Sequence, residues 1–127
     1  MEVINIQEKF TRVEGFWNPH IVAELNGQHV KLARLKGEFV WHHHETEDEL
    51  FYVLRGTLRM AFRDKEVSIG PGECMVVPRG VEHKPIADEE VEIMLFEPAS
   101  TVNTGNIENE RHVLTCIKFN CTPWPKI

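Results

Sequence analysis

The chain has 127 residues, of which 42% are hydrophobic and 27% are charged, as is ordinary for a globular protein with a packed core. Its formal net charge is −6 with neutral histidines, which disfavours nucleic acids and anionic lipids as partners because both require a basic face. No apolar run approaches the roughly 20 residues of a membrane-spanning helix, and the first residues lack the pattern of a secretory signal. We therefore expect one domain over residues 1–127, with no nucleic-acid or membrane partner.

The three cysteines, Cys74, Cys116 and Cys121, are odd in number and have no paired spacing. This pattern is not that of a disulfide framework. It favours a reducing, cytoplasmic location. We expect Cys74 to be buried in an apolar strand, and the roles of Cys116 and Cys121 stay open.

Apart from one short helical turn, the first half of the chain is predicted as strands separated by turns. Asn5 can cap a turn of helix that extends through Phe10. Acidic residues 45–48 form a turn between two apolar segments. The predicted strands of this half, rich in apolar and β-branched residues, are 28–35, 38–44, 50–54, 57–62 and 66–69.

Proline and glycine mark the turns of the second half, at residues 70–72 and 78–80. An acidic turn is predicted at 88–90 and a polar loop at 99–106. The predicted strands of this half are 73–77, 91–96 and 113–119. Many short strands with almost no helix predict an all-β fold, either a closed barrel or two packed sheets.

Three of the seven histidines are consecutive, His42, His43 and His44. In a strand, side chains alternate between faces, so His42 and His44 point the same way and His43 points the opposite way. The Cα atoms of His42 and His44 would lie about 7 Å apart, from a rise of about 3.3 Å per residue. Two imidazoles at that spacing can bind one metal ion. Trp41 shares the outer face with His43, where it would meet either a dimer partner or the chain's own N-terminal segment.

Two further residues could complete this site. Glu49 opens the next strand, and a carboxylate beside two imidazoles suits first-row divalent metals. Glu47 and Asp48 are its rivals on sequence alone. His83 follows the turn at 78–80 and is distant in sequence, so its arrival beside the other residues is a long-range pairing that spacing does not prove.

Two ordered motifs in this region resemble those of the cupin superfamily. The pattern G-x4-H-x-H-x4-E-x6-G over residues 37–56 resembles the first cupin motif, and G-x5-P-x-G-x2-H over residues 72–83 resembles the second. The resemblance implies a jelly-roll β-barrel with a core over about 28–98, on which residues 1–27 and 99–127 pack. The chain is similar to small bacterial single-domain cupins described as mannose-6-phosphate-isomerase-like.

In cupins, two histidines and a glutamate of the first motif and the histidine of the second bind the metal. The resemblance therefore implies four ligands, which are His42, His44, Glu49 and His83. It also implies one divalent transition metal (iron, manganese, zinc or nickel) and a homodimer, since cupins of this size usually pair. No other acid–base residue stands out, so the catalytic group is unknown and is expected to be metal-bound water or the substrate itself.

The predicted function is a metal-dependent enzyme acting on a small molecule, with oxidoreductase (dioxygenase) and isomerase (sugar or keto-acid) chemistry both open. The alternative is a cupin that binds or senses a small ligand without turnover, and a third reading is a metal site that only stabilises the fold. Arg34, Arg59 and Arg79 could hold an anionic substrate but are expected to face solvent. The predicted pocket is apolar, lined by Val40, Phe51, Val53, Met60, Met75, Met94 and Phe96.

The polar loop over residues 99–106 follows the last strong strand of the predicted barrel. It could lie across a barrel mouth as a lid, join a dimer contact, or serve as a mobile connection. His20, His29 and His112 belong to no motif and are expected at the surface.

Overall fold

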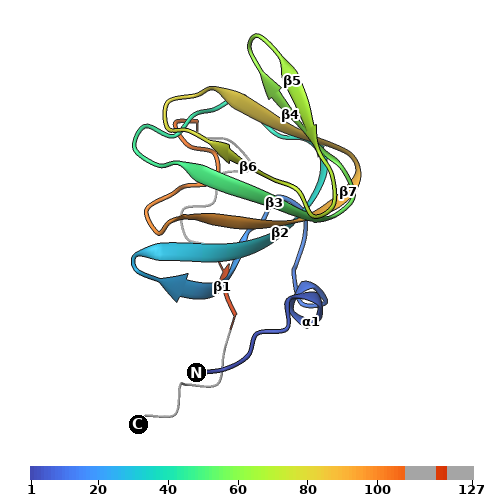
Figure 1. Cartoon of the computed structure of the whole chain (residues 1–127), viewed down its shortest axis with the longest axis vertical. Helices are drawn as coiled ribbons and strands as arrows, with labels where there is room; N and C mark the ends of the chain where they lie inside the picture. Colours follow the sequence, from blue (N-terminus) through green and yellow to red (C-terminus); the bar gives the residue numbers. More distant parts are fainter. Residues whose placement is uncertain (108–116, 120–127) are drawn as a thin grey trace.

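The computed structural model describes residues 1–107 and 117–119 as one short helix and eight strands (Figure 1). In chain order the elements are α1 (Ile6–Phe10), β1 (His20–Leu25), β2 (Gln28–Glu38), β3 (Glu49–Arg55), β4 (Leu58–Phe62), β5 (Glu66–Ile69), β6 (Cys74–Val77), β7 (His83–Pro98) and β8 (Ile117–Lys118). This confirms the predicted all-β fold with little helix. No helix within the described ranges is long and apolar enough to cross a membrane.

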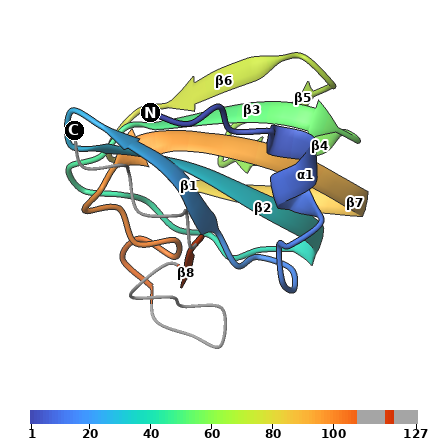
Figure 2. The same ribbon diagram turned by 90° about the horizontal axis from the view of Figure 1, so that it is seen from below.

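Strand β7 is the longest strand and joins the two halves of the barrel. Its first residues pair with β4, where His83 lies opposite Phe62, and its later residues pair with β3, where Phe96 lies opposite Leu50. Along its other edge, β7 pairs with β2. The strand order β5-β4-β7-β2-β1-β8, with β3 joining β7 to β6, is thus a sheet that curls around an interior (Figures 1 and 2).

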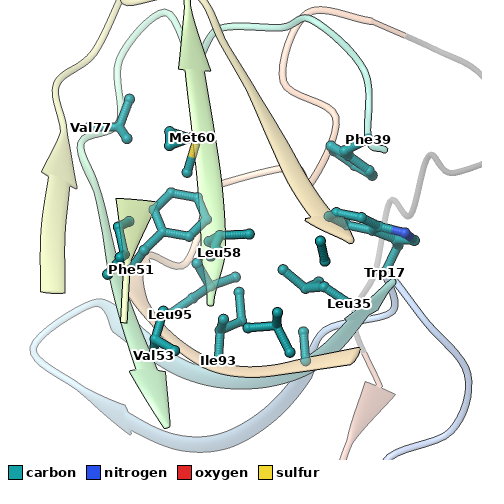
Figure 3. Close-up of a cluster of buried hydrophobic side chains, with 14 residues drawn as sticks. Trp17, Leu35, Phe39, Phe51, Val53, Leu58, Met60, Val77, Ile93 and Leu95 are labelled. Atoms are coloured by element: carbon teal, nitrogen blue, oxygen red, sulfur yellow. The ribbon is translucent and has the colours of Figure 1, made fainter. Parts of the chain in front are cut away.

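The interior is filled by a cluster of buried apolar side chains contributed by strands on both sides of the barrel (Figure 3). Phe51, Val53 and Met60 face this interior, as predicted, and are at most 4% exposed, but of the three only Phe51 also lines the pocket described below. Val40 and Met75 are partly buried against it. Full burial of a side chain of this size contributes about 1.5–3 kcal/mol, so the cluster is the main source of the barrel's stability.

The prediction that Met94 and Phe96 face the interior is wrong. Ile93 and Leu95 face it instead, and Met94 packs in a second cluster on the outer face of the sheet, which α1 covers through Phe10. Both faces of this part of β7 are apolar because both are covered. Alternation in the sequence therefore does not reveal which face is the inner one.

Helix α1 is held at both ends. It begins after Asn5, whose Oδ1 accepts a hydrogen bond from the Glu8 backbone N at 3.0 Å, as predicted for a cap. The Arg34 guanidinium of β2 donates to Phe10 O at 2.9 Å and to Val13 O at 3.2 Å. Phe10 O also accepts from the Val13 backbone N at 3.2 Å, beyond the end of the helix. Arg34 is therefore not solvated as expected, but ties the N-terminal segment to the sheet.

Residues 38–44 do not form the predicted strand. Strand β2 continues through Gly37, whose φ of 88° favours glycine, to Glu38, across an irregularity in its pairing with β7. Beyond Glu38 the chain meets β7 through the Phe39 backbone N, which donates to Pro85 O at 3.0 Å, and through an isolated bridge that joins His42 to His83.

The acidic residues 88–90 lie within β7 and not in the predicted turn. Leu35 is opposite Val91 and Gly37 is opposite Ala87, so β7 takes four steps against two of β2 and bulges by two residues. Because two is an even number, side chains on both sides of the bulge keep the same facing.

Cys74 is exposed, contrary to expectation, because it lies on the outward face of the edge strand β6. Of the predicted strand 113–119, β8 covers Ile117–Lys118. Residues 113–116 lie outside the described residues, as do His112, Cys116 and Cys121.

Other residues expected to face solvent have protein partners. His20 is 1% exposed, and its ring nitrogens bond backbone groups of the N-terminal segment. Arg59 pairs with Asp88 at 2.8 Å, and Arg79 pairs with Asp48 at 3.1 Å. These arginines are thus engaged with carboxylates of the chain itself.

Candidate metal centre

The four predicted ligands come from three segments that the fold brings together. His42 and His44 lie on the extended segment after β2, Glu49 is the first residue of β3, and His83 is the first residue of β7. The long-range step is made by backbone bonds, from His42 N to His83 O at 3.1 Å and from His83 N to His42 O at 2.9 Å. This bridge supplies the pairing that spacing alone does not prove.

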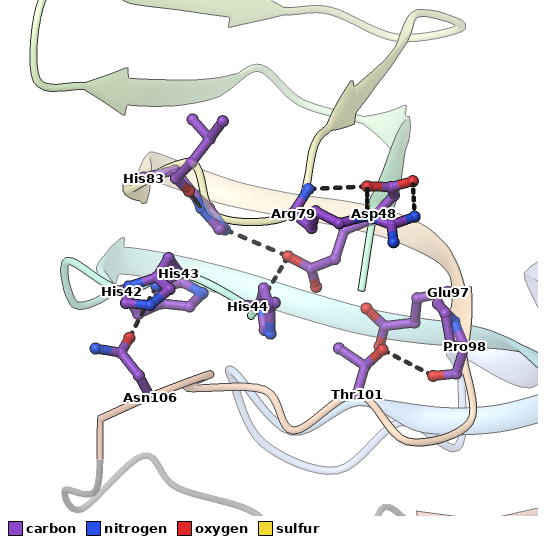
Figure 4. Close-up of polar contacts among 12 residues, drawn as sticks. His42, His43, His44, Asp48, Arg79, His83, Glu97, Pro98, Thr101 and Asn106 are labelled. Atoms are coloured by element: carbon purple, nitrogen blue, oxygen red, sulfur yellow. Dashed lines mark hydrogen bonds and ion pairs between the residues drawn. The ribbon is translucent and has the colours of Figure 1, made fainter. Parts of the chain in front are cut away.

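The side chains of His42, His44 and His83 point toward one another (Figure 4), and Glu49 joins them in the interior. One donor atom from each lies within 4.8 Å of the donor atoms of the others. His42, His44, Glu49 and His83 are between 0% and 4% exposed. The convergence matches the predicted set, and we refer to it as the imidazole cluster.

The residues between the ligands face outward, as predicted. His43 is half-buried, and its Nε2 lies 2.6 Å from Glu45 Oε1. Trp41 lies under the Arg63 guanidinium, at 4.0 Å from the ring centroid. Asp48, one of the rivals of Glu49, bonds Arg79 on the surface.

Backbone carbonyls fix the orientation of two imidazoles. His42 Nδ1 lies 2.8 Å from Val40 O, and His83 Nδ1 lies 2.9 Å from Val81 O. A carbonyl oxygen only accepts, so each Nδ1 carries the proton and donates it. The lone pair of each ring is therefore on Nε2, as is typical of metal-ligating histidines.

The cluster contains buried polar atoms that the protein does not satisfy. His44 Nε2 is 2.9 Å and His83 Nε2 is 3.3 Å from Glu49 Oε1, yet none of these three atoms has a hydrogen-bond partner. Each buried polar atom left in this way costs about 1–3 kcal/mol. Two ligands at right angles and about 2.1 Å from one ion would be separated by about 3.0 Å. The donor set therefore fits a divalent transition metal.

The protonation states also suit a cation. Burial and the neighbouring His83 lower the pKa of His42 to about 4, so that its ring is neutral at physiological pH. Burial raises the pKa of Glu49, but contacts with His44, His83 and Glu97 outweigh it and hold that pKa well below its usual range. Neutral imidazoles and an ionised carboxylate are the forms that bind metal.

Glu97 is a site residue that the sequence analysis missed. It is 2% exposed, its Oε1 lies 2.8 Å from Lys31 Nζ, and its Oε2 has no hydrogen-bond partner. Burial and the adjacent Glu49 raise the pKa of Glu97, and Lys31 lowers it only in part. Glu97 is an even number of positions after His83 on one strand and so faces the same side, but the predicted turn at residues 88–90 concealed that relation.

A pocket opens beside the imidazole cluster. Its empty volume is about 420 Å³, part of which is open to solvent. Its polar lining residues are His42, Glu49, Glu97 and Asn103. Its apolar lining residues are Trp17, Pro19, Ala33, Leu35, Phe39, Phe51, Pro85, Ile93 and Leu95.

The loop that follows β7 packs on the segment that carries the histidines. Asn106 Oδ1 accepts from His43 N at 2.9 Å, and Asn106 N donates to His43 O at 3.1 Å. Gly105 has a φ of 56°, and a Cβ there would collide with the His43 carbonyl oxygen. The loop thus supports the positions of His42 and His44 from outside the barrel.

The comparisons with known proteins agree with this geometry. The family described as "Cupin domain" matches residues 28–97, and the chain belongs to this family. A cupin-2 domain protein from Shewanella frigidimarina is 49% identical, with a TM-score of 0.74 over 76% of this chain and 94% of that one. Protein NMB1881 from Neisseria meningitidis is 28% identical, with a TM-score of 0.71 over 77% of this chain and 100% of that one.

A curated relative adds sequence similarity but no activity. The uncharacterized protein YdbB of Bacillus subtilis is 41% identical over 64 residues, which are 50% of this chain and 57% of that protein. The chain thus matches little more than half of that relative's length. None of these descriptions names a reaction, so the mannose-6-phosphate-isomerase-like resemblance stays a prediction.

Proposed function

We propose that the protein is a metal-dependent enzyme that acts on a small molecule and holds one divalent transition ion through His42, His44, Glu49 and His83. The observation that carries this proposal is the set of buried nitrogen and oxygen atoms without hydrogen-bond partners, at the edge of a pocket. A site of this kind is satisfied by a cation and is reached from the pocket.

The residues of the chain have distinct roles in this proposal. Neutral imidazoles and the Glu49 carboxylate would hold the ion, with the tautomers of His42 and His83 set by backbone carbonyls. Apolar walls would exclude water from the reacting end of the pocket. When bound, zinc, manganese or nickel would supply Lewis-acid chemistry suited to an isomerase, and iron would supply redox chemistry suited to a dioxygenase.

Elemental analysis of protein purified without added metal tests the proposal and separates the reaction classes. We expect one ion per chain, with iron favouring an oxidoreductase and zinc or nickel an isomerase. Dialysed protein should take up one equivalent when offered iron, manganese, zinc or nickel. Failure to bind any of the four ions would contradict the proposal.

The second candidate is a cupin that binds or senses a small ligand without turnover, and the apolar character of the pocket favours it. Proton NMR of the metal-loaded protein with a panel of keto acids, sugars and hydroxylated aromatic compounds distinguishes the two. New product signals would identify an enzyme. Saturable binding without product would identify a binding protein.

We also propose that two copies pair, in the cytoplasm. Val76, Leu50 and Phe96 lie side by side on the outer face of β6, β3 and β7, and Val76 is 53% exposed. An exposed apolar row of this kind is typical of a contact surface. Sedimentation analysis should give a dimer for the wild type and a monomer for Val76→Asp.

A further inference from the structure

The chemistry of the pocket restricts what can occupy it. Its described lining residues include two carboxylates, Glu49 and Glu97, and no lysine or arginine. Lys31 lies behind Glu97 and is 2% exposed. The described lining therefore offers no arginine or lysine to hold an anionic group of a ligand. The remaining walls are apolar, so the body of the ligand must be apolar as well.

Three lining residues, Trp17, Pro19 and Asn103, lie outside the region that matches the cupin family, 28–97. Trp17 is the best supported of them. Its backbone φ is 59°, a conformation that residues other than glycine rarely adopt. Its backbone N donates to Arg34 O at 2.9 Å, and its Nε1 donates to Lys36 O at 2.8 Å. These bonds hold Trp17 as a fixed wall of the pocket.

The aromatic wall is reinforced from the family region. The rings of Trp17 and Phe39 stack with centroids 4.7 Å apart and an interplanar angle of 20°. Phe51 forms part of the opposite side of the interior (Figure 3). Rings fixed in this way suit a compact apolar molecule, aromatic rings in particular.

Glu97 supplies the polar contact within these walls. Lys31 engages its Oε1, while its Oε2 is buried without a hydrogen-bond partner and lies at the pocket. A hydroxyl group both donates and accepts, so it can pair with this oxygen whether or not the carboxyl carries a proton. The unpartnered oxygen therefore selects for a hydroxyl.

We propose that the pocket takes a compact, uncharged molecule with an apolar body and a hydroxyl group, which Glu97 anchors beside the imidazole cluster while Trp17 holds the body. Sugar phosphates and carboxylates are disfavoured, because the described lining residues include no arginine or lysine to bind their anionic group. This proposal rests on the proposed function in one respect, which is that the metal ion is taken to lie at the end of the pocket formed by Glu49.

Phenol and anisole form a matched pair of probes, since they share an apolar ring and differ in the hydroxyl proton. With zinc-loaded protein we expect phenol to bind about tenfold more tightly than anisole, the value of one hydrogen bond. Glucose 6-phosphate should not bind measurably. Affinities are measured by calorimetry and by saturation-transfer NMR.

Two variants separate the hydroxyl contact from the apolar wall. Lys31→Met combined with Glu97→Leu removes the anchor without leaving a buried charge, and replacement of a buried pair by apolar residues is commonly tolerated. We expect it to bring phenol and anisole to within about twofold of one another. Trp17→Ala should weaken both probes by about tenfold and keep their ratio.

Equal binding of phenol and anisole to the wild type would overturn the anchor. Tight binding of glucose 6-phosphate, or no binding of either aromatic probe, would overturn the ligand class. Metal uptake is measured on the same samples. If the wild type takes up no zinc but still prefers phenol, the proposed function fails and the assignment of the pocket stands.

Discussion

Two buried polar groups share the barrel interior and differ in how they are satisfied. The Lys31–Glu97 pair contains its own counter-charge, with a lysine nitrogen and a carboxylate oxygen 2.8 Å apart, although Glu97 Oε2 has no hydrogen-bond partner. The imidazole cluster presents to its centre the lone pairs of His42 Nε2 and His83 Nε2, together with the His44 ring and the Glu49 carboxylate. Both groups are almost fully buried. The first has its counter-charge within the chain, and the second requires one from outside.

This difference separates a buried group that carries its own counter-charge from a group that needs a cation to supply one. A buried ion pair already offsets much of its desolvation by mutual attraction. A cluster of acceptors facing one another gains that offset only when a cation arrives. The comparison therefore predicts which substitutions change metal affinity and which change only the stability of the fold.

The largest effect should come from His44→Ala, which removes a ligand. We expect zinc affinity to fall by about a thousandfold, since each of four ligands contributes several kcal/mol to sites of this kind. Competition with a chromophoric chelator measures it. His43→Ala is the matched control, because His43 faces outward, and it should bind zinc as the wild type does. A similar loss of zinc affinity in His44→Ala and His43→Ala would show that the imidazole cluster does not bind the ion through His44.

Lys31→Met should break the self-contained pair and leave the Glu97 carboxyl buried without its counter-charge. We expect the free energy of unfolding in urea to fall by about 3 kcal/mol. Adding Glu97→Leu should restore it to within about 1 kcal/mol of the wild type. Zinc affinity should stay within about threefold in the single variant. Unchanged stability of Lys31→Met would show that Glu97 does not depend on Lys31 for its counter-charge.

Acid should weaken the imidazole cluster even without an ion. The unfolded chain protonates His42 below its usual pKa of 6.5, whereas the folded chain does so only near 4. The unfolded state thus binds more protons in this window, and the stability of metal-free protein falls as the pH drops from 6.5 toward 4, by up to about 3 kcal/mol. Urea unfolding across this pH range measures the slope. His42→Phe should reduce the slope and His43→Gln should not.

The smallest effect should come from the loop that supports the cluster. Gly105→Ala places a Cβ against the His43 carbonyl, so we expect a loss of about 2 kcal/mol in stability and a roughly tenfold loss in zinc affinity. Gly72→Ala is the control, since its φ is 81° but nothing lies within 4 Å of the added atom. That variant should lose only about 1 kcal/mol and bind zinc normally.

The sequence predicted the imidazole cluster for a reason that did not depend on the exact strand boundaries. His42 and His44 share a face because the chain is extended there, although it is not part of a ladder as expected. Glu49 and His83 were selected by the cupin motifs, which encode a long-range pairing that local patterns lack. The backbone bridge between His42 and His83 is the physical form of that pairing.

Glu97 was missed because an acidic turn was placed at residues 88–90. With a turn there, the positions of Glu97 and His83 in the sequence would not show whether their side chains point to the same side of the sheet. The segment is instead a bulge of two residues inside one strand, which preserves the facing. Composition could not reveal this, because acidic residues are exposed in a turn and in an outward bulge alike.

The walls contributed by Trp17 and Asn103 have a consequence for how such proteins diverge. They belong to the segments before and after the family region, whereas the imidazole cluster belongs wholly to that region. Substitutions in the flanking segments can therefore alter ligand preference while the ion is held as before. Homologues with the same four donors can accordingly evolve toward different chemistry. Their sequences should differ most in the segments before and after the family region.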